Sequence, residues 1–204
     1  MNPERKIAIV DDDAALRDAL SWLFSTRNHQ VELFESGEAL LANFRPEDIA
    51  CILLDVRMPG MSGLEVFTEL KKKPYCPPVI FLTGHGDVPM AVNAIKQGAA
   101  DFVEKPFADN DIVDLVERCL ANDDATRQVW QLQANVSTRL AQLTPREREV
   151  LKLILVGRLN KQIADDLAIS MKTVEVHRAR TLEKMQVKTA MELAALLREA
   201  GVEA

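Results

Sequence analysis

Residues 50–60 have the sequence ACILLDVRMPG, in which an apolar run over 50–55 ends at the carboxylate of Asp55. A continuous apolar run of this length is typical of a strand that is buried on both faces. Four similar runs, rich in Ile, Val, Leu or Phe, occur elsewhere in the first 121 residues, at 6–10, 30–34, 79–83 and 101–104. The chain therefore begins with five predicted strands.

Longer amphipathic stretches accompany these strands, over 14–26, 37–44, 63–73, 88–98 and 110–120. In the first stretch an apolar stripe is formed by Leu16, Leu20, Leu23 and Phe24, which is the pattern of a helix packed on a core. Strand–helix–strand units cross over in a right-handed sense and so place helices on both faces of a sheet. We therefore expect an α/β fold with a doubly wound, five-stranded parallel sheet.

The rest of the chain is predicted to be helical. Residues 123–142 contain no Pro or Gly, and their apolar residues recur every three or four positions. Such a stripe could pair with a second copy of itself or pack against one of the chain's own domains. Beyond Leu143 four helices are expected, over 145–156, 160–167, 171–185 and 190–200. The predicted organisation is an α/β domain at 1–121, a helical linker at 122–142 and a small all-α domain at 143–204.

Charge is distributed unequally between the two ends of the chain. Residues 1–136 contain 13 Lys and Arg against 22 Asp and Glu, whereas residues 137–204 contain 12 against 9. A basic C-terminal part is a candidate for binding a polyanion. The three cysteines have no paired spacing, and no apolar run approaches the roughly 20 residues of a membrane span. With no signal-peptide pattern either, we expect a cytoplasmic protein that does not insert into membranes.

Carboxylates follow two neighbouring strands of the predicted sheet. The first strand is followed by Asp11, Asp12 and Asp13, and Asp55 ends the third. Open parallel sheets have their sites at the carboxyl ends of strands, so these groups should converge. Clustered carboxylates disfavour mutual ionisation, and hard oxygen ligands of this kind suit Mg²⁺ or Mn²⁺. For Asp13 we favour another interpretation, as the N-cap of the following helix.

An aspartate in this setting can attack a phosphoryl group while a metal neutralises the phosphoryl oxygens. The candidate nucleophile is Asp55. The fourth and fifth strands end with groups that a bound phosphate would need, the hydroxyl of Thr83 and the ammonium of Lys105. The sequence therefore predicts a phosphoryl-accepting site at this edge of the sheet.

Four motifs in this region, IVDDD at 9–13, LLDVRMPGMSG at 53–63, FLTGHGD at 81–87 and DFVEKPF at 101–107, together resemble the receiver domain of two-component response regulators. The resemblance implies a flavodoxin-like strand order of 2-1-3-4-5. It implies that Asp55 is the phosphoacceptor, that Asp12 binds the metal directly and Asp11 through water, and that Arg57 contributes its backbone carbonyl. A sensor histidine kinase would be the phosphoryl donor.

The same resemblance assigns a switch to three residues. Thr83 would turn toward the phosphoryl oxygens, Lys105 would pair with them, and Phe102 stands at the position of the switch aromatic. Phosphorylation would then reshape the far surface of the domain, which commonly forms a dimer contact or releases an output domain. Loss of the phosphoryl group by self-dephosphorylation is expected, but not turnover of a substrate.

The C-terminal part starts with a helix that satisfies its own N-terminus. Thr144 is the expected N-cap, Pro145 occupies the first helical position, and Glu147 completes a capping box. Gly157 should end this helix, and Asn160 should cap the next. A short turn then leads to a third helix, which gives a helix-turn-helix arrangement.

In this third helix the expected buried side consists of Val174, Thr181, Leu182 and Met185. On the opposite side lie Glu175, Val176, Ala179 and Glu183, which would enter a DNA groove. Flanking positions that could contact phosphates are Lys172, Thr173, Arg180 and Lys184, with Lys161 at the start of the preceding helix. His177, near the edge, is interpreted as a packed residue.

Residues 143–185, LTPREREVLKLILVGRLNKQIADDLAISMKTVEVHRARTLEKM, resemble the DNA-binding domain of the LuxR, NarL and FixJ group. The resemblance implies that 172–183 is the recognition helix and that Glu175, Val176 and Ala179 can meet base edges. Arg178 stands where relatives often carry an apolar residue. The expected partners are promoter DNA, a second copy of the phosphorylated chain on a two-fold site and RNA polymerase.

These features favour a phosphorylation-controlled transcription regulator, with two alternatives. One is a Mg²⁺-dependent phosphohydrolase that works through an aspartyl phosphate. This alternative is opposed by the position of Asp55 on the third strand, because haloacid-type hydrolases have their nucleophile and second aspartate in a DxDxT motif on the first strand. The other is a receiver whose C-terminal helices dock a protein instead of DNA.

Overall fold

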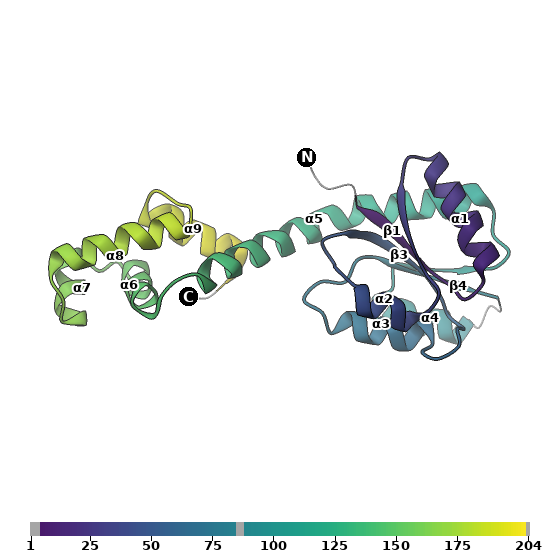
Figure 1. Cartoon of the computed structure of the whole chain (residues 1–204), viewed down its shortest axis with the longest axis horizontal. Coiled ribbons are helices and arrows are strands. Elements are labelled where there is room, and N and C mark those ends of the chain that lie inside the picture. Colours follow the sequence, from purple (N-terminus) through teal and green to yellow (C-terminus); the bar gives the residue numbers. More distant parts are fainter. Residues whose placement is uncertain (1–4, 85–87, 203–204) are drawn as a thin grey trace. The chain divides into compact units, whose positions relative to one another are not determined.

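The computed structural model describes residues 5–84 and 88–202 (Figure 1). Residues 85–87, at the end of the FLTGHGD motif, lie outside the described residues. Two compact units make up the chain, Met1–Ala125 and Thr126–Ala204.

The first unit contains the predicted five-stranded sheet. Every pair of neighbouring strands is parallel, and the order is β2-β1-β3-β4-β5, as expected (Figure 1). The strands are β1 Lys6–Val10, β2 Gln30–Phe34, β3 Ile49–Asp55, β4 Val79–Thr83 and β5 Asp101–Glu104. The strand order reverses between β1 and β3, which lie side by side. The chain segments that follow these two strands therefore lead away from each other at the carboxyl edge of the sheet.

Four helices of this unit follow the predicted pattern. They are α1 Ala14–Thr26, α2 Gly37–Asn43, α3 Gly63–Lys71 and α4 Val88–Lys96. The predicted N-cap of α1 is confirmed, since the Asp13 carboxylate accepts the N–H groups of Ala15 and Leu16. Helices α2 to α4 end slightly earlier than expected. For α4 the reason is Gly98, which has a left-handed φ of 95° and lies beyond the last helical residue.

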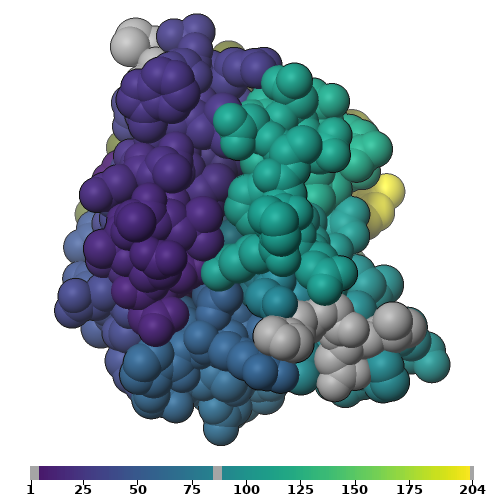
Figure 2. Space-filling view, turned by 90° about the vertical axis from the view of Figure 1, so that its right-hand side faces the viewer, coloured from purple at the N-terminus to yellow at the C-terminus, as the bar shows by residue number. Residues whose placement is uncertain are grey.

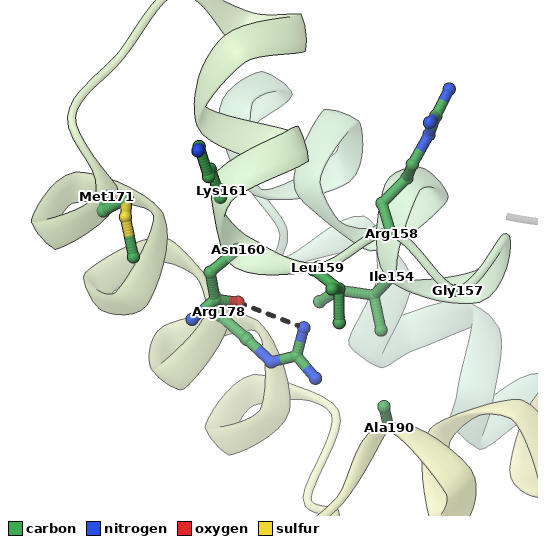
Figure 3. Close-up of a pocket in the computed structure, with 9 residues that line it drawn as sticks. All are labelled: Ile154, Gly157, Arg158, Leu159, Asn160, Lys161, Met171, Arg178 and Ala190. Atoms are coloured by element: carbon green, nitrogen blue, oxygen red, sulfur yellow. Dashed lines mark hydrogen bonds between the residues drawn. The ribbon is translucent and has the colours of Figure 1, made fainter.

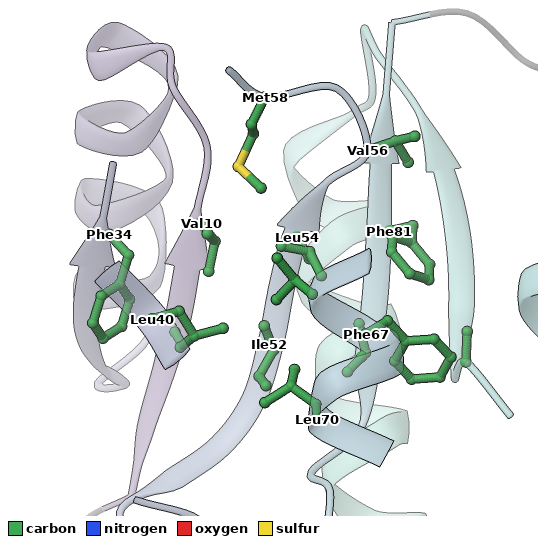
Figure 4. Close-up of a cluster of buried hydrophobic side chains, with 14 of the residues drawn as sticks. Val10, Phe34, Leu40, Ile52, Leu54, Val56, Met58, Phe67, Leu70 and Phe81 are labelled. Carbon is green, nitrogen blue, oxygen red and sulfur yellow. The ribbon is translucent and has the colours of Figure 1, made fainter. Parts of the chain in front are cut away.

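Apolar side chains cover both faces of the sheet. On one face the side chains of α2 and α3 pack on strands β1, β3 and β4, with Leu40, Phe67 and Leu70 among those in Figure 4. On the other face α1 and the start of the next helix, α5, bury Phe24 and Val113 against the sheet. Figure 2 shows α1 in purple beside the start of α5 in teal. Helices on both faces confirm the doubly wound architecture.

Helix α5 runs without a break over Asp109–Ala141. The sequence predicts a helix over 110–120 and a helical linker from 122 onward, and the structure joins the two. The physical reason is that no Pro or Gly interrupts this stretch, so nothing stops the helix. Its first part lies in the first unit and the remainder in the second.

The second unit contains the four expected helices, α6 Pro145–Leu155, α7 Asn160–Leu167, α8 Met171–Lys184 and α9 Ala190–Ala200. The predicted capping box of α6 is confirmed: Thr144 accepts the N–H of Glu147, whose side chain accepts the N–H of Thr144. Val136 and Leu140 of α5 are buried in the same core as α6 to α9. The C-terminal half of α5 therefore belongs to the core of this unit.

The prediction that Asn160 caps α7 is wrong. Leu159 occupies the N-cap position, and its apolar side chain makes no capping hydrogen bond. Asn160 is the first helical residue, and its Oδ1 accepts a hydrogen bond from Arg178 instead. The extended backbone of Leu159, whose N–H donates to Oε1 of Gln162 at 2.9 Å, sets the helix start one residue before a cap at Asn160 would.

Within the described part of the chain, no helix has both the length and the apolar character that a bilayer crossing requires.

Candidate functional site

Three charged side chains meet at the carboxyl edge of the sheet. Asp11 follows β1, Asp55 ends β3 and Lys105 follows β5. The Nζ atom of Lys105 lies 2.6 Å from Oδ2 of Asp11 and 2.6 Å from Oδ1 of Asp55. Both carboxylates are almost fully buried, and the lysine side chain is 23% exposed. The structure therefore brings together three residues that the sequence predicts at this edge.

Backbone N–H groups hold the remaining carboxylate oxygens. Oδ1 of Asp11 accepts the N–H of Asp13 at 2.9 Å, and Oδ2 of Asp55 accepts the N–H of Arg57 at 2.8 Å. Each carboxylate is thus fixed by its own loop on one oxygen and by Lys105 on the other. This leaves little rotational freedom to either group.

The loop after β3 is packed closely against the start of α3. The N–H of Gly63 donates to the carbonyl of Val56 at 3.0 Å. A Cβ atom at Gly63 would lie 2.2 Å from the carbonyl oxygen of Asp55, so only glycine fits at this position. The close approach positions the backbone that carries Asp55.

Burial and the neighbouring charges shift the acid–base properties of the site. Burial raises the pKa of Asp55, and the hydrogen bond and charge of Lys105 only partly oppose this. For Lys105, burial alone would lower the pKa, but hydrogen bonds to Asp11 and Asp55 outweigh it and the pKa is raised. Two carboxylates facing one ammonium give the cluster a net negative charge, which favours binding of a cation.

The donor atoms fit a hard divalent cation such as Mg²⁺. This ion typically takes one or two carboxylates and keeps several water ligands. Among the described residues, no three or more His, Cys, Asp and Glu side chains are grouped so that they could hold a metal. A cation here would therefore depend on Asp11, Asp55, a backbone carbonyl and water, with Asp12 exposed beside them.

The other predicted site residues of this unit lie at or near the same edge. Thr83 ends β4, the strand next to Asp55, and its side chain is buried. Phe102 in β5 is half-buried, with its ring centroid 6.2 Å from that of Phe81. Arg57, the predicted carbonyl ligand, follows Asp55 by two residues and is exposed.

In the second unit, helix α8 has the two-sided character that the sequence predicts. Val174, Thr181 and Met185 are fully buried, and Leu182 is half-buried. The residues expected to face a groove are all exposed, namely Glu175, Val176, Ala179 and Glu183. The helix therefore presents a polar face to solvent.

Most of the predicted phosphate contacts lie on the surface around this face. Lys161, Lys172 and Arg180 are exposed, and Thr173 shares a hydrogen bond with Ser170 at 2.8 Å. The ammonium of Lys184 is already engaged, because it lies 2.7 Å from the buried carboxylate of Glu147 and also donates to the carbonyl of Gln142.

Two contacts that fix α8 were not anticipated from the sequence. One is the Glu147–Lys184 ion pair, which adds a long-range role to a capping residue. The other is the guanidinium of Arg139, which donates to the backbone carbonyl of Met185 at the end of α8. No spacing signal marks either pair, since the partners come from different helices.

Comparisons with known proteins agree with this architecture. Residues 7–117 match the family model of the response regulator receiver domain, and residues 141–197 match that of bacterial regulatory proteins of the luxR family. Receiver domains generally bind Mg²⁺ at their phosphorylation site.

Similar proteins extend over nearly the whole chain. The C4-dicarboxylate transport transcriptional regulatory protein DctR of Rhodobacter capsulatus is 47% identical over 190 residues, which cover 92% of this chain and 96% of that protein. The transcriptional regulatory protein FixJ of Bradyrhizobium diazoefficiens is 38% identical over 202 residues, covering 99% and 98%. The solved structure of the response regulator StyR matches with a TM-score of 0.75 and 37% identity, covering 96% of this chain and 99% of that one. With a receiver unit and a LuxR-type DNA-binding unit, this chain belongs to the NarL/FixJ family of two-component transcriptional response regulators.

Proposed function

We propose that a sensor histidine kinase phosphorylates Asp55 and that this modification controls promoter binding by the LuxR-type unit. The observation that supports this most is the position of Lys105, 2.6 Å from the carboxylates of both Asp11 and Asp55. An ammonium at this place can pair with phosphoryl oxygens as soon as they arrive on Asp55.

The transfer needs only a displacement at phosphorus. An oxygen of Asp55 attacks the phosphorus of a phosphohistidine, the O–P bond forms, and the N–P bond breaks. The departing imidazole keeps the electron pair of that bond and takes a proton from water. Burial raises the pKa of Asp55 and so makes it a stronger nucleophile than an ordinary carboxylate.

When bound, a Mg²⁺ or Mn²⁺ ion would supply positive charge that offsets the negative charge on the phosphoryl oxygens. Asp12 would bind it directly, Asp11 through water, and Asp55 and the carbonyl of Arg57 would complete the protein ligands. The two carboxylates of Asp11 and Asp55 carry more negative charge than the single ammonium of Lys105 neutralises, and this favours a bound cation.

The switch follows from competition for the same lysine. Phosphorylation replaces the single negative charge of the Asp55 carboxylate by nearly two on the phosphoryl oxygens and draws Lys105 away from Asp11. The hydroxyl of Thr83 turns toward the phosphoryl oxygens, and Phe102 moves into the space that Thr83 leaves. These contacts shift the population of the receiver toward its active form. Hydrolysis of the aspartyl phosphate, without turnover of any other substrate, ends the signal.

Helix α8 is proposed to enter the major groove of promoter DNA. Glu175, Val176 and Ala179 would meet base edges, because they are exposed on the side opposite the core. The proposed phosphate contacts are Lys161, Lys172, Thr173, Arg180 and Lys184. We further propose that the phosphorylated chain binds as a homodimer in the cytoplasm and contacts RNA polymerase from the promoter.

Intact-mass measurement after incubation with acetyl phosphate and Mg²⁺ tests the phosphoacceptor. The wild type should gain one phosphoryl group and Asp55→Asn none. Asp18→Asn is the matched control, since Asp18 is an exposed carboxylate on α1 and should leave uptake unchanged. Uptake by Asp55→Asn would refute the assignment.

A further inference from the structure

The second unit has a pocket of about 570 Å³ between the start of α7, helix α8 and the start of α9 (Figure 3). Three cationic side chains line it, those of Arg158, Lys161 and Arg178. None of the described residues that line it is acidic, although Nε of Arg158 lies 3.5 Å from Oδ2 of Asp166 outside the lining. The pocket is therefore suited to an anionic group.

Arg178 lies on the inner side of this pocket. Its guanidinium extends from α8 toward Asn160 and Leu159, whereas Arg158 and Lys161 extend outward (Figure 3). Among the described residues its hydrogen-bond partner is Oδ1 of Asn160, at a long 3.4 Å. A guanidinium has five N–H donors, and a half-buried one gains stability when they are satisfied. Most of its donors thus have no acceptor among the residues that the structure describes.

The position of Arg178 on α8 relates it to the groove-facing side. Successive residues of a helix are turned by about 100° about its axis. Measured around α8 from the buried Val174, Arg178 lies at about 40°, Ala179 at about 140° and Arg180 at about 240°. The groove-facing residues therefore lie between Arg178 on one flank and Arg180 on the other. A major groove is about 12 Å wide and has a sugar–phosphate backbone along each side. In a helix lying in such a groove, the two arginines would therefore be on the sides of opposite backbones.

We propose that this pocket binds a DNA backbone phosphate through Arg178, on the side of the groove opposite the backbone contacted by Arg180. The inference rests on the proposed binding of α8 to DNA. Asn160 orients the guanidinium through Oδ1, and Lys161 adds positive potential at the rim, whereas the charge of Arg158 is offset by its ion pair with Asp166. The first turn of α7, which has no side-chain cap, directs its N–H groups to the same region. A carboxylate of a partner protein has similar chemistry, but the position of Arg178 on the flank of the groove face favours phosphate.

Salt dependence of DNA binding by the full chain tests the proposal. The probes are a duplex selected in vitro from random sequence and a scrambled duplex of the same length, with the chain in acetyl phosphate and Mg²⁺. In Arg178→Gln both affinities should fall by the same factor, roughly ten-fold. The slope of log affinity against log salt should become shallower by about 0.9. Arg178→Lys, which keeps the charge, should retain the wild-type slope.

Arg198→Gln is the matched control, because it removes one exposed charge of the same unit from α9, away from the pocket lining. It should leave the slope unchanged. An unchanged slope in Arg178→Gln, or an equal loss of slope in Arg178→Lys, would overturn the pocket as a phosphate site. If Arg178→Gln does not fold, the NMR signal of the Arg178 Nε–H group in the wild type provides the test. This signal should shift when duplex is added, and the absence of a shift would overturn the proposal. Failure of the wild type to bind any duplex would instead refute the proposed function.

Discussion

The ammonium of Lys105 lies 2.6 Å from a carboxylate oxygen of Asp55, although the two residues are 50 positions apart in the sequence. The contact arises because β3 and β5 both end at the carboxyl edge of one parallel sheet, with β4 between them. Asp11 shares the same ammonium from β1. A single lysine thus balances two buried carboxylates, and any new charge on Asp55 must change this balance.

The first prediction concerns the cost of burying Asp55. Its pKa is raised in the folded protein, so its contribution to stability is present below the ordinary value of 3.8 and is lost as the pH rises through the folded pKa. Asp55→Asn should therefore increase the free energy of unfolding near pH 7, by roughly 1–2 kcal/mol. Near pH 4 the difference from wild type should be smaller. Urea unfolding at both pH values measures it, and a variant less stable than wild type at pH 7 would contradict the prediction.

The second prediction concerns removal of Lys105. In Lys105→Met the carboxylates of Asp11 and Asp55 face each other without a counter-charge, which should cost roughly 3 kcal/mol at neutral pH. Mg²⁺ should restore part of this loss, so it should raise the melting temperature of the variant more than that of the wild type. Lys96→Met, an exposed lysine at the end of α4, is the control. An equal effect of Mg²⁺ on variant and wild type would argue against a cation at this edge.

The third prediction concerns the ion pair that holds α8. Burial alone would raise the pKa of Glu147, but the hydrogen bond and charge of Lys184, with the N–H of Thr144, outweigh it and lower the pKa below 4.5. A lowered pKa gives stability that is present above about 4.5 and lost as the pH falls through the folded pKa. Lys184→Met should lose roughly 2 kcal/mol at pH 7, where the wild type has the full benefit.

Melting temperatures of the LuxR-type unit at a series of pH values measure both the loss of wild-type stability at low pH and the loss caused by Lys184→Met at pH 7. The exposed Lys188→Met is the control and should follow the wild-type curve. If Lys184→Met unfolds at the wild-type temperature at pH 7, the pair does not stabilise the unit.

The fourth prediction concerns the start of the DNA-binding unit. Val136 and Leu140 of α5 are 0% and 9% exposed in the core that α6 to α9 form. A fragment of residues 143–204 lacks both side chains, and burial of each contributes roughly 1.5–3 kcal/mol. It should therefore be several kcal/mol less stable than a fragment of residues 126–204. Circular dichroism during heating compares them, and equal melting temperatures would support the domain start at 143 that the sequence suggests.

Much of the fold follows from the sequence because the strand signals are strong. Each strand is a short run of apolar residues, and four of the five begin and end at the predicted residues. The ends of helices are harder to predict, because neighbouring residues can compete for the cap position. At the start of α7 the local preference of Asn160 predicts a cap, but Leu159 occupies the cap position and its N–H donates to Oε1 of Gln162.

The candidate site was predictable in part for a similar reason. Strand ends place Asp11, Asp55 and Lys105 at one edge, and the motifs around them indicate the family. The sequence does not determine which ion pairs form within such a group. Lys184 shows this most clearly, since its flanking position predicts a phosphate contact but gives no sign of the ion pair that its ammonium makes with Glu147, 2.7 Å away and 37 positions earlier in the chain.

The most direct test measures the affinity of the full chain for a selected duplex before and after acetyl phosphate treatment in Mg²⁺, in wild type and in Asp55→Asn. Analytical ultracentrifugation of the same samples reports self-association. We predict that phosphorylation changes the wild-type affinity at least ten-fold, together with formation of a dimer, and leaves Asp55→Asn unchanged. Equal affinities with and without the phosphoryl group in the wild type would contradict control of DNA binding through Asp55.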